Sequence, residues 1–127
     1  MKGLKFRVWD KERECYLDET ELAGITPDGK YILYIEEEEI SRLEIDENYV
    51  VEFDTGLKEK NGNEIYENDI LEDGSGEPLE YWLVRFKDGK FIGSTQGVDE
   101  DIFELTDLEI IGNIHENPDL LEEKWQS

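Results

Sequence analysis

The side chains in this sequence that could carry out chemistry are 35 aspartates and glutamates, one histidine and one cysteine. Paired carboxylates can act as general acid and general base. In so acidic a chain many close pairs arise from composition alone, so no pair stands out. Cys15 lies near Glu14 and Asp18, whose charges disfavour the thiolate that a nucleophile needs. His115 is the only imidazole, and no nucleophile motif surrounds the four serines, which are Ser41, Ser75, Ser94 and Ser127.

No motif for a cofactor or a metal ion is present either. The Gly-rich segment 72–78 (EDGSGEP) lacks the Gly-Lys-Ser/Thr sequence of a phosphate-binding loop and the alternating oxygen ligands of a calcium loop. A transition-metal site would have to combine carboxylates with a single histidine. We therefore expect no cofactor and no catalysis, and we keep a carboxylate-based enzyme as the second alternative.

The formal net charge of −22 is far from that of an ordinary protein of this size. A protein that binds nucleic acid directly presents basic side chains to the phosphates, so this charge disfavours DNA or RNA as a ligand. It favours a basic protein as the partner. The candidate partner-binding residues are the acids of two clusters, which are Glu36, Glu37, Glu38 and Glu39, and Asp99, Glu100 and Asp101.

Strand patterns dominate the chain and predict a mainly β fold. The clearest is the hairpin 81–93 (YWLVRFKDGKFIG), in which Trp82, Val84 and Phe86 share one face and Asp88-Gly89 forms the turn. The segment 93–101 after it has the composition of a loop. Further strands are expected at 5–10, 14–19, 30–35, 49–53 and 108–114.

Two segments have less regular patterns. Glu36 to Glu39 is expected to be a solvated face or loop at a seam between two subdomains, and Ile40 and Leu43 after it have the spacing of one face of a short helix. Gly112 interrupts the last strand, as a β-bulge or a close backbone approach would require.

The C-terminal segment predicts one short helix over residues 117–125. Asn117 has the residue type of an N-cap, and Pro118 suits the first helical position. An apolar stripe at helical spacing usually faces a core, so we expect the helix to cap the sheet rather than to bind a partner. The stripe consists of Leu120, Leu121 and Trp125.

Three stretches resemble the signatures of the YopX family of phage and prophage proteins. They are TGLKEKNGNEIYENDIL (55–71), IIGNIHENPDLL (110–121) and, more weakly, KFRVWDKERECYLDE (5–19). The resemblance implies a mostly β protein with an SH3-like barrel, encoded by a bacteriophage or prophage, and it implies no established biochemical activity. Asn68 replaces the usual Gly before Asp-Ile, and Asn tolerates the left-handed region best among the other residues. His115 replaces the usual Tyr, which favours a packing role.

From these patterns and the resemblance we predict an N-terminal β meander (1–47) and a YopX-like SH3-type barrel with a C-terminal capping helix (48–127). No apolar run is long enough for a membrane helix, and the N-terminus lacks the apolar core of a signal peptide, so the bacterial cytoplasm is the expected location. Open sheet edges also predict self-association into a homo-oligomer, which the charge opposes.

The expected function is that of a non-enzymatic accessory protein that binds or regulates a basic host or phage protein. The first alternative is an acidic mimic of nucleic acid that occupies the DNA-binding face of a host protein. A mimic should present carboxylates in rows at the spacing of phosphates.

Overall fold

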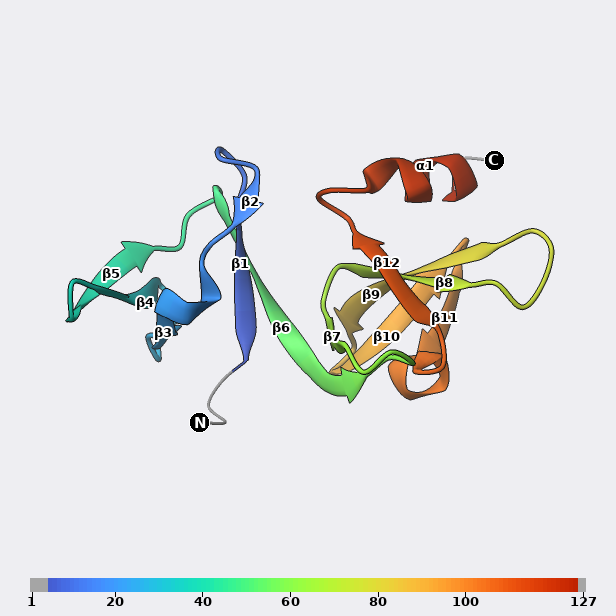
Figure 1. Ribbon diagram of the computed structural model, residues 1–127, viewed down its shortest axis with the longest axis horizontal. Helices are drawn as coiled ribbons and strands as arrows, with labels where there is room; N and C mark the ends of the chain where they lie inside the picture. The colour runs from blue at the N-terminus through green and yellow to red at the C-terminus, as the bar shows by residue number, and fades with distance from the viewer. Residues whose placement is uncertain (1–4, 126–127) are drawn as a thin grey trace. The chain divides into compact units, whose positions relative to one another are not determined.

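The computed structural model describes residues 5–125, including the side chains of residues 5–121. The chain forms two compact units, Met1–Phe53 and Asp54–Ser127. Both are built almost entirely from antiparallel strands, and one α-helix follows the last strand (Figure 1). The mainly β prediction with one short terminal helix is therefore confirmed.

The first unit contains two small sheets. In one, β1 pairs with β2 and with the first half of β6, and Phe6 faces Phe53 in that register. In the other, the order is β3-β4-β5. The strands are β1 (Phe6–Asp10), β2 (Cys15–Tyr16), β3 (Leu22–Ile25), β4 (Tyr31–Glu36), β5 (Glu39–Glu44) and β6 (Tyr49–Lys58), and the 3-10 helix η1 (Glu19–Glu21) precedes β3.

The core of the first unit forms from the alternating apolar residues of these strands. Phe6, Val8 and Ile32 are its buried centre. Because successive side chains of a strand alternate between faces, Ile32 points inward while Ile35 is on the opposite face, where it is 44% exposed. Partly buried residues surround the centre, namely Leu17, Leu22, Ile25, Leu43, Ile45, Tyr49 and Val51.

The second unit is organised around a five-stranded sheet of order β11-β10-β9-β8-β12, in addition to the pairing of β7 with the end of β6. This curled half-barrel is consistent with the SH3-like barrel that the resemblance implies. Its elements are β7 (Glu64–Tyr66), β8 (Asp69–Asp73), β9 (Glu80–Lys87), β10 (Lys90–Thr95), β11 (Val98–Asp101), the 3-10 helix η2 (Ile102–Leu105), β12 (Glu109–Asn113) and α1 (Pro118–Trp125).

Both faces of this sheet carry apolar clusters. Trp82 and Val84 pack on one face with Ile102 and Leu105 of η2. The indole Nε1–H of Trp82 has no hydrogen-bond acceptor among the described residues. On the other face, Leu121 of α1 packs against Ile70 and Leu83, and Leu120 joins them, so the helix covers the core as expected. The side chain of Trp125, predicted for the same stripe, lies outside the described residues.

Turn residues are where the sequence predicted the backbone best. Asp88 and Gly89 take φ values of 53° and 83° and connect β9 to β10 as a two-residue hairpin turn. Asn68 takes φ 71°, so it occupies a left-handed position, as expected for a residue that replaces the Gly implied by the resemblance. The register of β12 on β8 shifts between Ile110 and Gly112, which confirms the predicted irregularity.

Two predictions about local structure were wrong. The segment 93–101 is not a loop, because β10 continues to Thr95 and β11 returns along it after a tight turn at Gln96 and Gly97, both with positive φ. Ile40 and Leu43 belong to β5 rather than to a helix, since Glu37 and Glu38 make a two-residue turn that pairs β5 with β4.

The structural division falls between Phe53 and Asp54, whereas the sequence suggested a boundary between residues 47 and 48. The reason is β6, a ten-residue strand whose first half pairs with β1 and whose second half pairs with β7. The start of the apolar run at Tyr49 is therefore the start of a strand that both units use.

Candidate functional site

The first predicted cluster forms the tip of the β4–β5 hairpin, which we call the acidic hairpin (residues 35–40). Glu37 and Glu38 are its two turn residues, with φ values of 51° and 69°, and Glu36 pairs with Glu39 across the ladder. All four carboxylates are exposed. The hairpin lies within the first unit and not at a seam between subdomains.

Next to these acids the acidic hairpin carries an exposed apolar pair. Ile35 and Ile40 face each other across the ladder and are 44% and 66% exposed. Four like charges and two large apolar side chains therefore share one hairpin end. None of the salt bridges formed by the described residues involves the four glutamates.

The second predicted cluster lies on the edge strand β11 of the second unit, and part of its charge is already neutralised. Asp99 forms an ion pair with Lys87 at 2.9 Å and accepts a hydrogen bond from Ser94 Oγ at 2.6 Å. The hydrogen bonds from Lys87 and Ser94 hold the pKa of Asp99 below its usual value. Asp101 lies 3.7 Å from the Lys90 ammonium. Of the two clusters, the acidic hairpin therefore has more carboxylates that are not neutralised within the protein and that a partner could contact.

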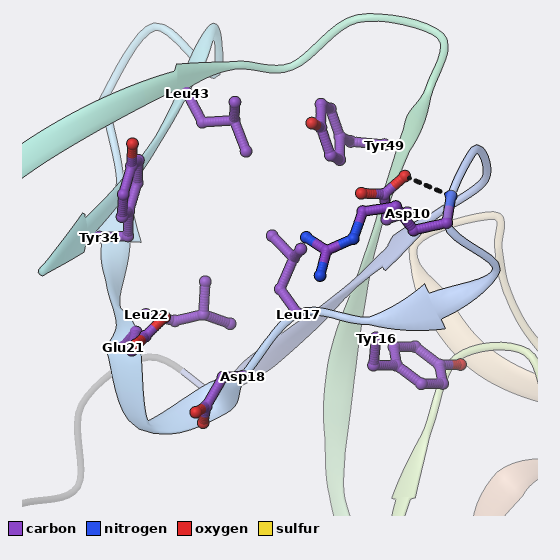
Figure 2. Close-up of a pocket in the computed structure, with 10 residues that line it drawn as sticks. Asp10, Tyr16, Leu17, Asp18, Glu21, Leu22, Tyr34, Leu43 and Tyr49 are labelled. Carbon is purple, nitrogen blue, oxygen red and sulfur yellow. Dashed lines mark hydrogen bonds between the residues drawn. The ribbon is translucent and has the colours of Figure 1, made fainter. Parts of the chain in front are cut away.

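A surface pocket of about 470 Å³ in the first unit was not anticipated from the sequence. We call it the tyrosine pocket. Figure 2 shows Asp10 and Tyr49 on one side, Tyr34 and Leu22 on the other, and Leu17 between them. The pocket opens at the margin of the apolar core, because several of its walls also pack on the buried centre of the unit. Its lining consists of Asp10, Arg13, Tyr16, Leu17, Asp18, Glu21, Leu22, Tyr34, Leu43 and Tyr49.

Asp10 is the buried charged group of the tyrosine pocket, with 3% of its surface exposed. Its Oδ1 atom accepts hydrogen bonds from the backbone N of Arg13 at 3.1 Å and from Asn48 Nδ2 at 2.9 Å. The bond from Asn48 is the largest influence and holds the pKa of Asp10 below its usual value, although burial acts in the opposite direction. The carboxylate is therefore ionised and oriented at neutral pH.

A second buried carboxylate lies in the same unit. Glu52 is fully buried, and its Oε1 atom accepts hydrogen bonds from Arg7 Nε at 2.7 Å and from Tyr16 Oη at 2.9 Å. The Arg7 guanidinium lies 4.6 Å from the centre of the Tyr16 ring, and Trp9 contacts that ring edge to face at 4.9 Å. The one feature of the sequence that indicates this buried carboxylate is the position of Glu52 inside the apolar run Tyr49–Phe53. Glu52 pairs with Arg7 of β1 in the ladder.

The only thiol and the only imidazole of the sequence belong to different units of the fold. No group of three or more His, Cys, Asp or Glu side chains in residues 5–121 has the arrangement of a metal site. Cys15 is a half-buried free thiol on β2, and His115 is half-buried after β12, where its backbone N donates to Asn113 Oδ1 at 3.0 Å. Across the described residues, no helix is both long and apolar enough to cross a membrane.

Comparison with known proteins agrees with the resemblance noted in the sequence. The model of the YopX family, described as YopX protein, matches residues 5–122. The chain belongs to the YopX family. A crystal structure of protein EF1440 from Enterococcus faecalis is similar to this YopX protein, with a TM-score of 0.61 and 26% sequence identity over 92% of this chain and 96% of that one. The comparison with curated proteins gave no match.

Proposed function

We propose that this YopX protein is a non-catalytic binding module of phage or prophage origin that captures a basic protein in the bacterial cytoplasm. The observation that carries the proposal is the acidic hairpin, where four exposed glutamates and an exposed Ile35–Ile40 pair occupy the same hairpin end. A partner with basic and apolar side chains would neutralise the glutamates and cover the isoleucine pair. Charge complementarity of this kind steers association and raises its rate.

The cost of the acidic hairpin supports a role in binding. Each non-glycine residue in the left-handed region costs roughly 1–2 kcal/mol, and Glu37 and Glu38 both occupy it. Glu36 and Glu39 face each other, and like charges directly opposite on a ladder are destabilising. An Asn-Gly turn would avoid both costs. The presence of four glutamates at this hairpin end is explained if they contribute to binding rather than to folding.

Affinity capture from a bacterial lysate, performed at low and at high salt, tests the proposal. We compare the wild type with the double reversal Glu37→Lys/Glu38→Lys and with the matched control Glu47→Lys/Glu80→Lys, which changes the net charge equally at exposed acids elsewhere. The expected result is a basic protein that binds the wild type and the control and binds the hairpin variant weakly. The difference in affinity between the wild type and the hairpin variant should be larger at low salt than at high salt.

Two outcomes would overturn the proposal. One is recovery of nucleic acid as the direct ligand. The other is equal loss of capture in the hairpin variant and in the control, which would indicate a response to net charge alone. If DNA displaces the captured protein from this YopX protein, the partner is itself a DNA-binding protein and the binding mode is that of a nucleic-acid mimic.

A further inference from the structure

We propose that the tyrosine pocket binds an arginine side chain of the basic partner. The inference rests on the proposed function and assigns it a second contact site in the first unit. The pocket, of about 470 Å³, lies within the range of 300–1,000 Å³ usual for ligand sites and is large enough for one long side chain with its adjoining backbone.

The lining has the two components that a guanidinium requires. Tyr34 and Tyr49 line the pocket with aromatic rings, and a guanidinium over the face of an aromatic ring is favourable. The same first unit already contains such contacts, because Arg42 lies 4.7 Å from the ring centre of Tyr31. The apolar walls of the pocket would contact the methylene groups of the arginine stem. These walls are Leu17, Leu22 and Leu43.

Asp10 is the carboxylate placed to receive the guanidinium. Its hydrogen bonds from Arg13 N and Asn48 Nδ2 end on Oδ1, and the Glu12 backbone N–H and the Arg13 charge also act on the carboxylate, so an arriving guanidinium would contact Oδ2 beside these groups. Because these bonds orient the carboxylate before any ligand arrives, little ordering entropy is lost on binding. Asp18 and Glu21 on the rim add negative charge.

Arg13 is the one basic residue of the lining, and its substitution tests whether the ligand is a cation or an anion. If the ligand is a cation, the Arg13 guanidinium repels it, and removal of that charge strengthens binding. If the pocket instead holds an anion, Arg13 is its main attraction, and the same substitution abolishes binding. The three acids of the lining outnumber this single base, which favours the cation.

The tyrosine pocket and the acidic hairpin share one sheet face. Tyr34 and Glu36 are two residues apart on β4, so their side chains point to the same side about 7 Å apart along the strand. A partner segment with an arginine in the pocket would therefore place a neighbouring basic residue beside Glu36. The Ile35–Ile40 pair lies on the opposite face of the same hairpin.

The test is an NMR titration of the ¹⁵N-labelled full chain with four capped tripeptides, Ac-Gly-X-Gly-NH₂, in which X is arginine, citrulline, lysine or glutamate. The expected result is saturable shifts for amides of residues 10–22 and 34–49 with the arginine peptide, with weaker binding of lysine and no saturable binding of citrulline or glutamate. Propylguanidinium, a monocation that carries the guanidinium without a peptide, is expected to bind more weakly than the arginine peptide. Propylguanidinium binding tighter than the peptide would overturn the assignment to a protein segment.

Variants at the rim separate this inference from general charge effects. Glu21→Gln and Tyr34→Leu should each weaken the arginine peptide roughly threefold to fivefold, the size of one exposed charge or cation–π contact. Arg13→Gln should strengthen it by a similar factor, and the control Glu77→Gln, an exposed acid of the second unit, should leave it unchanged. Asp10→Asn is not used alone, because Asp10 also stabilises the β1–β2 turn.

The arginine pocket and the proposed function can fail separately. Equal binding of citrulline and arginine, or loss of binding in Arg13→Gln, would overturn the arginine pocket. A basic protein partner whose capture depends on the acidic hairpin but not on Tyr34 or Glu21 would also overturn it, and the proposed function would stand. Loss of capture in Tyr34→Leu, with the fold intact by NMR, supports both.

Discussion

The Oε2 atom of Glu59 accepts a hydrogen bond from the backbone N of Ile110 at 3.0 Å, although 51 positions separate the two residues. The other oxygen of the same carboxylate accepts from the backbone N of Asn61 at 2.7 Å and of Asn63 at 3.1 Å. Glu59 therefore stabilises the turn before β7 and holds this turn against β12. Burial alone would raise the pKa of Glu59, but these backbone hydrogen bonds outweigh it and lower the pKa.

The substitution Glu59→Gln should destabilise the protein by about 1–3 kcal/mol at neutral pH, because an amide NH₂ group would face a backbone N–H. Since the folded-state pKa of Glu59 is below the ordinary value of 4.5, the stabilisation by the carboxylate is fully present above that pH and is lost as the pH falls through the folded-state pKa. Urea unfolding of wild type and variant from pH 7 to pH 3 checks this. A difference in stability that stays constant over this range would contradict it, and Glu104→Gln, an exposed acid, is the control.

The Arg7–Glu52 pair should show the behaviour of a buried ion pair. The Glu52 side chain is 1% exposed, so Glu52→Met or Arg7→Met alone removes one member of the pair while the charge of the other remains, and should cost about 3–5 kcal/mol. The double replacement Arg7→Met/Glu52→Met should cost clearly less than the sum of the single changes. Denaturant unfolding of the four proteins forms a double-mutant cycle. Additive costs would mean that the two residues act independently.

Gly112→Ala should destabilise the second unit, because an added Cβ would overlap with Asn117 Oδ1. That oxygen accepts a hydrogen bond from the backbone N of Asn113 and cannot move away without breaking it. A cost of about 1–3 kcal/mol is expected, as for other overpacked sites. Gly24→Ala is the matched control, since nothing lies within 4 Å of a Cβ there. Equal melting temperatures of the two variants would show that the chain relaxes around Gly112.

Replacement of the hairpin turn should raise stability and lower binding at once. Glu37→Asn/Glu38→Gly installs residues suited to positive φ, so the melting temperature should increase by the equivalent of roughly 1–2 kcal/mol. Capture of the basic partner should weaken, because two of the four carboxylates are lost. Thermal unfolding and the capture assay measure the two effects. A variant that is stabilised but binds normally would remove Glu37 and Glu38 from the proposed interface.

Salt should stabilise the wild type. A net charge of −22 on a small protein is self-repelling, and the Debye length falls from about 10 Å at 0.1 M salt to about 3 Å at 1 M. The melting temperature is therefore expected to rise between these concentrations. An unchanged melting temperature in sodium chloride would indicate that the acids are already paired.

Local signals in the sequence predicted the backbone where one or two residues decide it. Asp88-Gly89 and Asn68 adopt the left-handed conformations that their residue types allow, and Gly112 lies at the irregularity in β12. The strand β11 was missed, because four residues with three acids have little strand propensity and it is their pairing with β10 that orders them.

The site was harder to predict than the fold. The acidic hairpin was visible as a block of four glutamates, but its two-residue turn was not, since Glu is an uncommon residue at positive φ. Asp10 and Glu52 looked like ordinary acids of an acidic chain. Their burial depends on Asn48 and Arg7, partners 38 and 45 positions away, and no periodicity in the sequence encodes such distances.

The burial of Trp9 and Trp82 gives each unit an optical reporter of its own. Trp9 packs edge to face on Tyr16 in the first unit, and Trp82 lies in the core of the second unit, where no residue that the structure describes accepts a hydrogen bond from its indole N–H. An indole in such apolar surroundings should emit at shorter wavelength than one in water. In chains that retain a single tryptophan, fluorescence would then follow the melting of one unit at a time and tell whether both units lose their structure together.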